Sequence, residues 1–388
     1  MTLRSKHLLW AAIGAYASGF CALSILRHHS FNTGRFDLGN MTQAVWATAH
    51  GHPLAVTNLE GDQVSRLGSH VDPILVAFAP LWWIWPSPSM LLAAQAIAVA
   101  IGALPVFWLA RKHLGSERAG LGFALAYLLY PAVQWLTLAE FHPVALACPL
   151  LLFAFWYLDE DRLVPFAVFA GLAALTKEEI PLVIAAMGIW YALSRKRYRI
   201  GGAIAVLGAV ATAISVKLVL PHYNEGASSS FYRRYGALGD SPGAILGTVF
   251  TDPGRLVDVA FDSEGLHYLA DLLLPLVLLF AAAPLVLIAA IPELGLNLLS
   301  ATHTQSSIHH HYTAALIPPL MAATVLGAGR LARGEQRRAI VLAGIAVAAA
   351  LVANFRLGAI PLWRSLPGGS SYQAHMSHVS AHDRIAER

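Results

Sequence analysis

Residues 89–110 read SMLLAAQAIAVAIGALPVFWLA, an uncharged run that stops at Arg111 and Lys112. A helix needs about 20 such residues to cross ~30 Å of hydrocarbon. Similar runs recur along the 388-residue chain, which is 57% hydrophobic and only 12% charged, with a mean hydropathy of +0.58. A soluble domain carries about 25% charged residues, which cover its surface. We therefore predict an all-α, polytopic transmembrane helix bundle and exclude a soluble enzyme.

The apolar runs predict about eleven spans. They lie near 8–26, 89–110, 118–138, 142–158, 162–176, 180–194, 200–220, 267–283, 284–300, 313–329 and 339–353. The run 268–300 is too long for one helix, and Pro284 predicts a hairpin within it. A further stretch, 71–85, is short and ends in LWWIWP. Because tryptophan favours the membrane interface, we expect this stretch to lie at the surface or to re-enter.

Basic residues predict the orientation, because short cytoplasmic loops are rich in Lys and Arg. If 71–85 does not cross, every basic cluster falls on one side: Arg4, Lys6, Arg111, Lys112, Arg118, Arg162, Arg195, Lys196, Arg197, Arg199, Arg330, Arg333, Arg337 and Arg338. We expect a multi-pass protein of the cell (plasma) membrane with a cytoplasmic N-terminus. Residues 1–353 form the predicted transmembrane domain, with outer loops at 27–88 and 221–266. Residues 354–388 form a predicted extracytoplasmic tail.

Several classes of function are excluded or weakened by what the chain contains. Its two cysteines, Cys21 and Cys148, do not make a disulfide framework, and a net charge of +4 does not indicate nucleic acid. No nucleotide-binding loop, dinucleotide fingerprint or serine-nucleophile motif is visible. The predicted outer face holds most acidic residues and nearly all histidines, so we look for chemistry there.

The first outer loop carries FDLGNMTQAVW at 36–46. Asp37 can cap the helix that follows, with Met41, Val45 and Trp46 on its apolar face. A cap and a catalytic carboxylate are compatible, because a capping Asp is rigidly held and its second oxygen points outward.

Other polar groups stand at the outer ends of predicted spans. Glu140 with His142, and His70 with Asp72, are weak candidates for a divalent metal ion, which is a candidate cofactor. Lys177 and Glu178 belong to a group of three charges between short apolar helices, which predicts a shared polar cavity. In the second outer loop, Arg233 and Arg234 lie beside aromatic residues, a combination that suits a lipid phosphate or a solvated loop equally. Adjacent histidines at 309–311 do not favour one ion.

Taken together, these motifs resemble a prokaryotic family of multi-pass membrane proteins of unknown function. The resemblance rests on FDLG at 36–39 with Gln43 and Trp46, GSH at 68–70 with Pro73, FHP at 141–143, KE at 177–178, the 232–243 region, and NLLS at 297–300 with Gln305 and Tyr312. It covers most of the chain to about residue 353.

That family is similar to the GT-C glycosyltransferases. The resemblance implies transfer of a sugar from a polyprenyl-phosphate donor to an unidentified acceptor on the extracytoplasmic face. It implies Asp37 as general base and interfacial helices in the first outer loop. We expect His70, Lys177, Arg233 or Arg234 to neutralise the phosphate, and Glu140, His142 and Glu178 to position the sugar or an ion; Gln305 and Tyr312 are further substrate-binding candidates. The chain lacks the acidic pair of some GT-C members, since Leu38 follows Asp37. It also ends soon after residue 354, where relatives continue, so the tail is expected to be truncated or reduced.

Two other functions remain open at this point. A non-enzymatic carrier or flippase for a lipid-linked or small polar solute would line its path with the same polar residues. A metal transporter would use the histidine-rich outer face at 309–311. A transferase should gather Asp37, His70, His142 and Lys177 in one pocket, whereas a carrier should spread polar residues along a path at mid-membrane depth.

Overall fold

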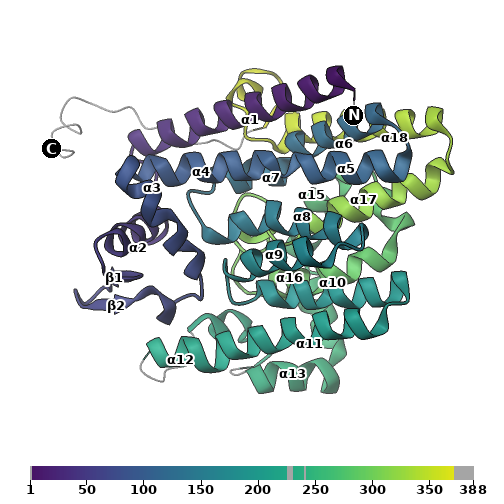
Figure 1. Cartoon of the computed structure of the whole chain (residues 1–388). Coiled ribbons are helices and arrows are strands. Elements are labelled where there is room, and N and C mark those ends of the chain that lie inside the picture. Colours follow the sequence, from purple (N-terminus) through teal and green to yellow (C-terminus); the bar gives the residue numbers. More distant parts are fainter. Residues whose placement is uncertain (1, 225–229, 240–241, 371–388) are drawn as a thin grey trace.

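The computed structural model of the chain describes residues 2–224, 230–239 and 242–370. Helices dominate these residues (Figure 1). They are α1 (Leu3–His29), α2 (Asn40–Ala49), α3 (Ala79–Ile84), α4 (Pro88–Ile101), α5 (Ala103–Leu114), α6 (Glu117–Leu129), α7 (Pro131–Leu138), α8 (Ala147–Asp159), α9 (Leu163–Ala174), α10 (Ile180–Arg195), α11 (Tyr198–Ile214), α12 (Leu220–Tyr223), α13 (Pro242–Thr251), α14 (Pro253–Ala260), α15 (Ser263–Leu273), α16 (Ile291–Leu298), α17 (Ile317–Ala332) and α18 (Gln336–Leu357). The two short strands are β1 (Ala55–Thr57) and β2 (Gln63–Ser65).

Four helical stretches among the described residues are long and apolar enough to cross a membrane: Leu3–His29, Pro88–Leu114, Tyr198–Tyr223 and Gln336–Leu357. A fifth is formed if α6 and α7, bent by 49° at their junction, count as one span. The bend falls at Pro131, which cannot continue the hydrogen-bond ladder of α6. Other apolar helices have 10–17 residues, α9 and α10 among them. The chain is therefore a helical membrane protein, and the count of eleven spans stays a prediction.

The predicted break in the run 268–300 is confirmed, although the segment is more irregular than two helices. Between α15 and α16 the chain forms 3-10 turns at Leu274–Leu276, Leu279–Ala282 and Pro284–Ala290. Val277 and Leu278 have φ of 53° and 52°, the left-handed region that β-branched and bulky residues avoid. Pro284 begins a new segment, as its sequence position predicts.

Small residues bring α10 and α11 into close contact. A Cβ at Gly188 would lie 2.7 Å from the carbonyl oxygen of Gly201, and one at Gly208 would lie 2.4 Å from that of Pro181. Such approaches are typical of helix pairs in membranes, where small residues let backbones pack directly. The far side of α11 exposes apolar side chains such as Val206, Leu207 and Val210, which suits contact with lipid.

Residues 35–84 fold into a compact piece at one end of the bundle, which we call the first-loop unit (left in Figure 1). Its core contains Leu38, Met41, Val45, Val56, Ile74, Leu75, Phe78 and Trp82. Met41 and Val45 are buried as predicted, whereas Trp46 is 46% exposed. The strands β1 and β2 pair in an antiparallel hairpin that the sequence did not predict. Gln43 ties α2 to this hairpin, since its side chain accepts from the backbone N–H of Thr57 at 3.1 Å.

The stretch 71–85 does not form a helix long enough to span. It consists of a 3-10 turn, Pro73–Phe78, followed by α3. Trp82 is buried in the unit's core, but Trp83, Ile84 and Trp85 are exposed. The unit meets the end of the α11–α12 stretch at Gly68, where a Cβ would lie 2.5 Å from the carbonyl oxygen of Tyr223.

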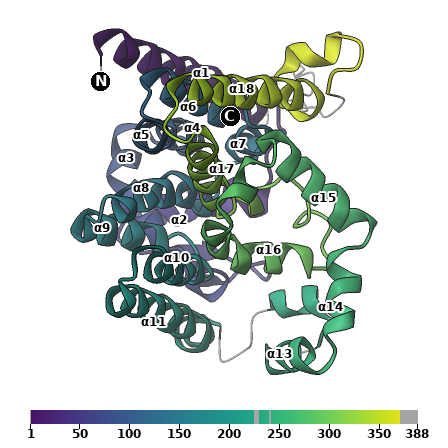
Figure 2. The ribbon, with the colours of Figure 1, turned by 90° about the vertical axis from the view of Figure 1, so that its right-hand side faces the viewer.

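The predicted cytoplasmic ends gather at the opposite end of the bundle. Thr2 donates from its backbone N–H to Glu117, while Lys112 and Arg195 both pair with Asp159, at 2.6 and 2.7 Å. Gln336, at the start of α18, lines a groove with Thr2. In Figure 2 the bundle is turned by 90°, with α10 and α11 on one side and α13 to α16 on the other. Helix α18 runs four residues past the predicted end of the transmembrane domain, and part of the second loop (225–229, 240–241) and of the tail (371–388) lies outside the described residues.

Candidate functional site

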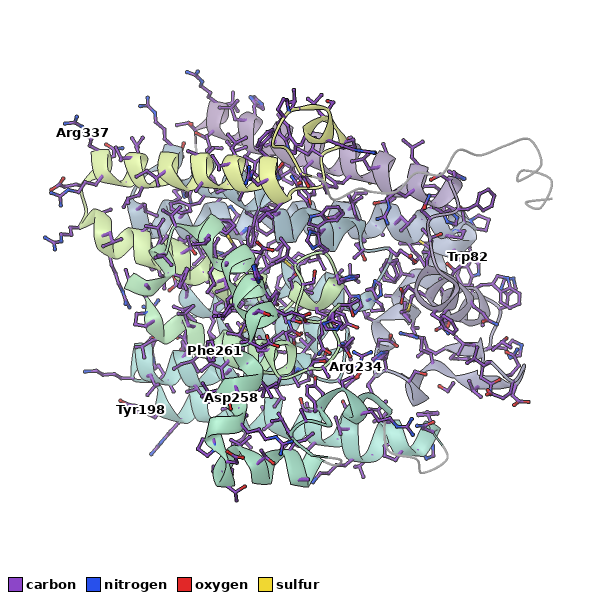
Figure 3. All side chains as sticks on the ribbon, turned by 180° about the vertical axis from the view of Figure 1, so that it is seen from behind. Trp82, Tyr198, Arg234, Asp258, Phe261 and Arg337 are labelled. Carbon is purple, nitrogen blue, oxygen red and sulfur yellow. The ribbon has the colours of Figure 1, made fainter. Side chains whose placement is uncertain are left out.

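A cavity of about 370 Å³ lies between the first-loop unit and the helix bundle. Its walls include seven of the predicted site residues: Asp37, His70, Asp72, His142, Lys177, Arg234 and Tyr312. In Figure 3, Arg337 and Tyr198 mark one end of the molecule, Trp82 lies toward the other, and Arg234 lies between them. The predicted gathering of Asp37, His70, His142 and Lys177 in one pocket therefore occurs.

Asp37 does not cap the following helix, contrary to the prediction. It lies inside a π-helical turn, Arg35–Gly39, and α2 begins after Gly39 without a side-chain cap. The carboxylate of Glu140 takes the capping role instead, because it accepts the backbone N–H groups of Gly34, at 2.8 and 3.0 Å, and of Leu38, at 3.1 Å. The Asp37 carboxylate is thus left for the cavity, with its side chain 52% exposed.

Glu140 is itself held in an uncommon conformation. Its φ is 59°, in the left-handed region that non-glycine residues rarely occupy, and such strain persists only where surrounding structure imposes it. Gln95, fully buried in α4, supplies that constraint: its amide donates to the carbonyl oxygen of Glu140, and its oxygen accepts the backbone N–H of His142 at 2.9 Å. Glu140 therefore holds the backbone on either side of Asp37, and its role in positioning a sugar or an ion stays a prediction.

Asp37 and His142 face each other across the rim of the cavity. Asp37 Oδ1 lies 3.3 Å from His142 Nε2. The neighbouring His142 ring lowers the pKa of Asp37 below its usual range and outweighs partial burial, which raises that pKa. The His142 ring stacks on that of His311, with centroids 3.7 Å apart and planes at 22°. Asp37 is thus an ionised carboxylate at neutral pH.

Glu178 acts on the first-loop unit in the same way as Glu140. Its carboxylate contacts His70 Nδ1 at 2.9 Å and accepts the backbone N–H of Val71 at 3.0 Å. Burial alone would raise the pKa of Glu178, but His70 and Lys177 outweigh it and hold that pKa at about 2. Two carboxylates from turns of the bundle therefore tie down the two parts of the unit that line the cavity.

Lys177 and Arg234 bring positive charge to the far wall. Lys177 Nζ pairs with Glu179 at 2.6 Å and lies 5.6 Å from the centre of the Tyr312 ring. Burial would lower the pKa of Lys177, yet the neighbouring carboxylates, Glu179 foremost, raise it above its usual value. Arg234 donates to the Tyr312 hydroxyl at 3.2 Å and to Gln305 Oε1 at 3.4 Å. Gln305 thus positions Arg234 and does not reach the main cavity.

The two adjacent arginines of the second loop have different surroundings. Arg234 lines the cavity, whereas Arg233 is exposed and is not among the lining residues. Either arginine was predicted to bind phosphate, and of the two only Arg234 lines the cavity.

The weak metal candidates already contact other protein groups, although His70, Asp72 and His142 line the same cavity. Asp72 pairs with Arg66 at 2.7 Å, Glu140 holds backbone amides, and His70 contacts Glu178. Within the described part of the chain, no cluster of three or more His, Cys, Asp or Glu side chains could hold a metal ion. Binding of a divalent metal ion as a cofactor stays a prediction.

Sequence reasoning missed two buried polar residues near the site. Glu293 in α16 is 4% exposed and lines a smaller hollow of about 140 Å³, which shares His70, Lys177 and Arg234 with the main cavity. Gln95 in α4 holds the turn at 140–142. Both interrupt long apolar runs, and a lone polar residue within a predicted span was the signal that could have found them.

A family model described as "Predicted membrane protein (DUF2079)" matches residues 27–387. No curated protein and no solved structure matches the chain.

Proposed function

The chain belongs to this family of predicted membrane proteins, and on that premise we propose that it is an integral membrane glycosyltransferase of GT-C-like architecture. It transfers a sugar from a polyprenyl-phosphate donor to an acceptor on the extracytoplasmic face. The proposal includes the eleven spans and the cytoplasmic N-terminus inferred from the charge pattern, and it assigns Asp37 as the general base.

The observation that carries this proposal is the sharing of one cavity by an ionised carboxylate and two cations. Asp37 lies on the wall formed by the first-loop unit, and Lys177 and Arg234 lie on the wall formed by the bundle. Inverting transfer needs a base for the acceptor hydroxyl and positive charge for the leaving phosphate. Separate walls allow each group to act on its own end of the bond that is exchanged.

The chemistry follows from this placement. Asp37 takes the proton of the acceptor hydroxyl as its oxygen forms a bond to the anomeric carbon of the sugar. The bond from that carbon to the phosphate oxygen breaks, and its electron pair leaves with the polyprenyl phosphate. Lys177 and Arg234 stabilise the charge that develops there, and Tyr312 presents an aromatic face between the two cations.

The alternative, a carrier for a lipid-linked or small polar solute, has less support. Its polar residues should follow a path through the bundle. Here Asp37, His70, His142 and Lys177 meet in one cavity at the end that bears the first-loop unit. The buried apolar side chains of α5, α8 and α17 belong to one hydrophobic core cluster.

The decisive experiment compares lipid-linked sugars and surface glycans, by mass spectrometry, in cells with and without the gene. We expect the deletion to accumulate one polyprenyl-phosphate sugar and to lose one glycan. Wild-type protein and a Glu60→Gln control, which alters an exposed acid of the first-loop unit, should restore both; Asp37→Asn should restore neither. Purified wild-type protein should release free polyprenyl phosphate from the accumulated lipid, whereas a carrier would release none. An active, well-folded Asp37→Asn protein would remove Asp37 from the assignment.

Orientation is tested separately. Single cysteines at Glu60 and at Arg337, in a background with Cys21 and Cys148 replaced, should react differently with a membrane-impermeant maleimide on intact spheroplasts. We expect labelling at 60 only, and labelling at 337 only would place the cavity on the cytoplasmic side.

A further inference from the structure

The imidazole of His142 is buried, and its closest polar contact given by the structure is the 3.3 Å approach of Nε2 to Asp37 Oδ1. The residue is 7% exposed, and neither Nδ1 nor Nε2 has a hydrogen-bond partner among the described residues. Buried polar groups in folded proteins are nearly always paired, because an unpaired one loses its water without compensation. His142 also lines the main cavity. A ligand entering this cavity is therefore the natural partner for its ring.

The ring is fixed rather than mobile. On one side it stacks on His311, with centroids 3.7 Å apart. Its backbone N–H is bound by Gln95 at 2.9 Å, from a helix that is fully buried at that point. Burial lowers the pKa of His311 well below its usual value, so the stacked neighbour is uncharged. A binding group held in this way costs no rearrangement when a ligand arrives.

The placement of Asp37 Oδ1 relative to His142 Nε2 is informative. Asp37 Oδ1 lies 3.3 Å away, but the two atoms are not aligned for a direct hydrogen bond. Both atoms face the same cavity, and both turns that carry them are held by Glu140 and Gln95. An acceptor oxygen and a ring nitrogen that face one cavity in this way can both form hydrogen bonds to one hydroxyl placed beside them.

We propose that Asp37 Oδ1 and His142 Nε2 together form the subsite for the reacting hydroxyl of the acceptor. The inference rests on the proposed transferase function and deepens it. The hydroxyl donates its hydrogen to Asp37 Oδ1, and its oxygen accepts a hydrogen bond from His142 Nε2. In the reaction the proton stays on Asp37, the hydroxyl oxygen bonds to the anomeric carbon, and the phosphate leaves with the electron pair of the broken bond. The ligand class is an alcohol, such as a sugar hydroxyl.

The test uses His142→Phe, which keeps a ring to stack on His311 but removes both nitrogens. The matched control is His52→Phe, which changes an exposed histidine of the first-loop unit. Each full-length variant is assayed in membranes of the deletion strain, with the accumulated polyprenyl-phosphate sugar as probe and its consumption followed by mass spectrometry. Melting temperature of the purified protein is measured in parallel.

The subsite predicts that His142→Phe loses at least tenfold in rate while its melting temperature is unchanged or higher. It also predicts that the double variant Asp37→Asn, His142→Phe is no slower than Asp37→Asn alone, because both residues act on one hydroxyl. A fully active His142→Phe protein, or one that melts markedly lower, would assign His142 to packing and overturn the subsite while leaving the transferase function intact. A wild-type protein that consumes no lipid-linked sugar would overturn the transferase function, and the subsite with it.

Discussion

Both carboxylate oxygens of Glu140 accept the backbone N–H of Gly34, at 2.8 and 3.0 Å, although the residues are 106 positions apart. One of these oxygens also accepts the N–H of Leu38. Asp37 lies between these two amides in the sequence, so its position is set from the helix bundle.

Replacing Glu140 by Ala should therefore slow transfer without removing any group that touches substrate. The amides of Gly34 and Leu38 lose their acceptor, and a shift of the 35–39 turn by about 1 Å can cost roughly 100-fold in rate. Glu140→Gln keeps one acceptor oxygen, so its transfer rate should lie between those of the wild type and Glu140→Ala. Rates of donor consumption check this, with Glu60→Ala as the control. Equal rates for Glu140→Ala and wild type would show that the turn keeps its place without the clamp.

The pH dependence of transfer follows from the pKa of Asp37. A base must be ionised, so activity is lost as pH falls through that pKa. Because His142 lowers the pKa of Asp37, the acid limb of kcat/KM should lie below the value of an ordinary aspartate, about 3.9. In the residual activity of His142→Phe the limb should move up toward that value. An acid limb near neutral pH in the wild-type protein would point to a different base.

The two adjacent arginines should differ in their contribution to phosphate binding. Arg234→Met removes a cation from the cavity wall and should weaken binding of the lipid phosphate by about 10- to 100-fold, the range for hydrogen bonds to charged groups. Arg233→Met, at an exposed position, is the matched control and should bind as the wild type does. The affinity of each variant for polyprenyl phosphate is obtained by titration, with the melting temperature of the protein as the readout. Equal losses in the two variants would contradict the assignment of Arg234.

The first-loop unit should depend on one buried ion pair for its stability. Arg66 and Asp72 are 4% and 1% exposed, their side chains meet at 2.7 Å, and Arg66 also donates to Asn40 Oδ1. Arg66→Met leaves a buried carboxylate unpaired, which costs about 3–5 kcal/mol. The double variant Arg66→Met, Asp72→Asn should lose less than the sum of the single losses. Melting temperatures of the three proteins test this, and strict additivity would mean that the pair does not interact.

Much of the architecture could be predicted from composition and charge. Uncharged runs predicted helices, Pro284 predicted a break, and the tryptophans at 82–85 predicted a stretch that does not span. The meeting of Asp37, His70, His142 and Lys177 was predictable because each ends or follows an apolar run on the same side. These features depend on local patterns, which the sequence displays directly.

What could not be predicted depends on contacts between distant segments. Asp37 is of a residue type that commonly caps helices, but in the structure the carboxylate of Glu140 binds the amides of Gly34 and Leu38 in this turn. Glu140 and Glu178 were predicted to position a sugar or an ion, and their contacts with backbone amides of the first-loop unit could not be predicted, because the partners are more than 100 positions away. Arg233 and Arg234 cannot be distinguished by sequence, and the 3-10 turn Ser230–Tyr235 that carries both gives their side chains different surroundings. Long-range packing decides such cases, and it overrides local preference.

The close approach at Gly68 has a consequence for how this cavity could be manipulated. The first-loop unit and the α11–α12 stretch touch there backbone to backbone, with no side chain between them. Any larger residue at 68 acts as a wedge at a seam, because the opposing atoms are main-chain atoms that cannot rotate aside. Such a wedge would separate the wall that carries Asp37 from the rest of the molecule while leaving every chemical group in place. A substitution at position 68 would therefore change the geometry of the site without changing its chemical groups.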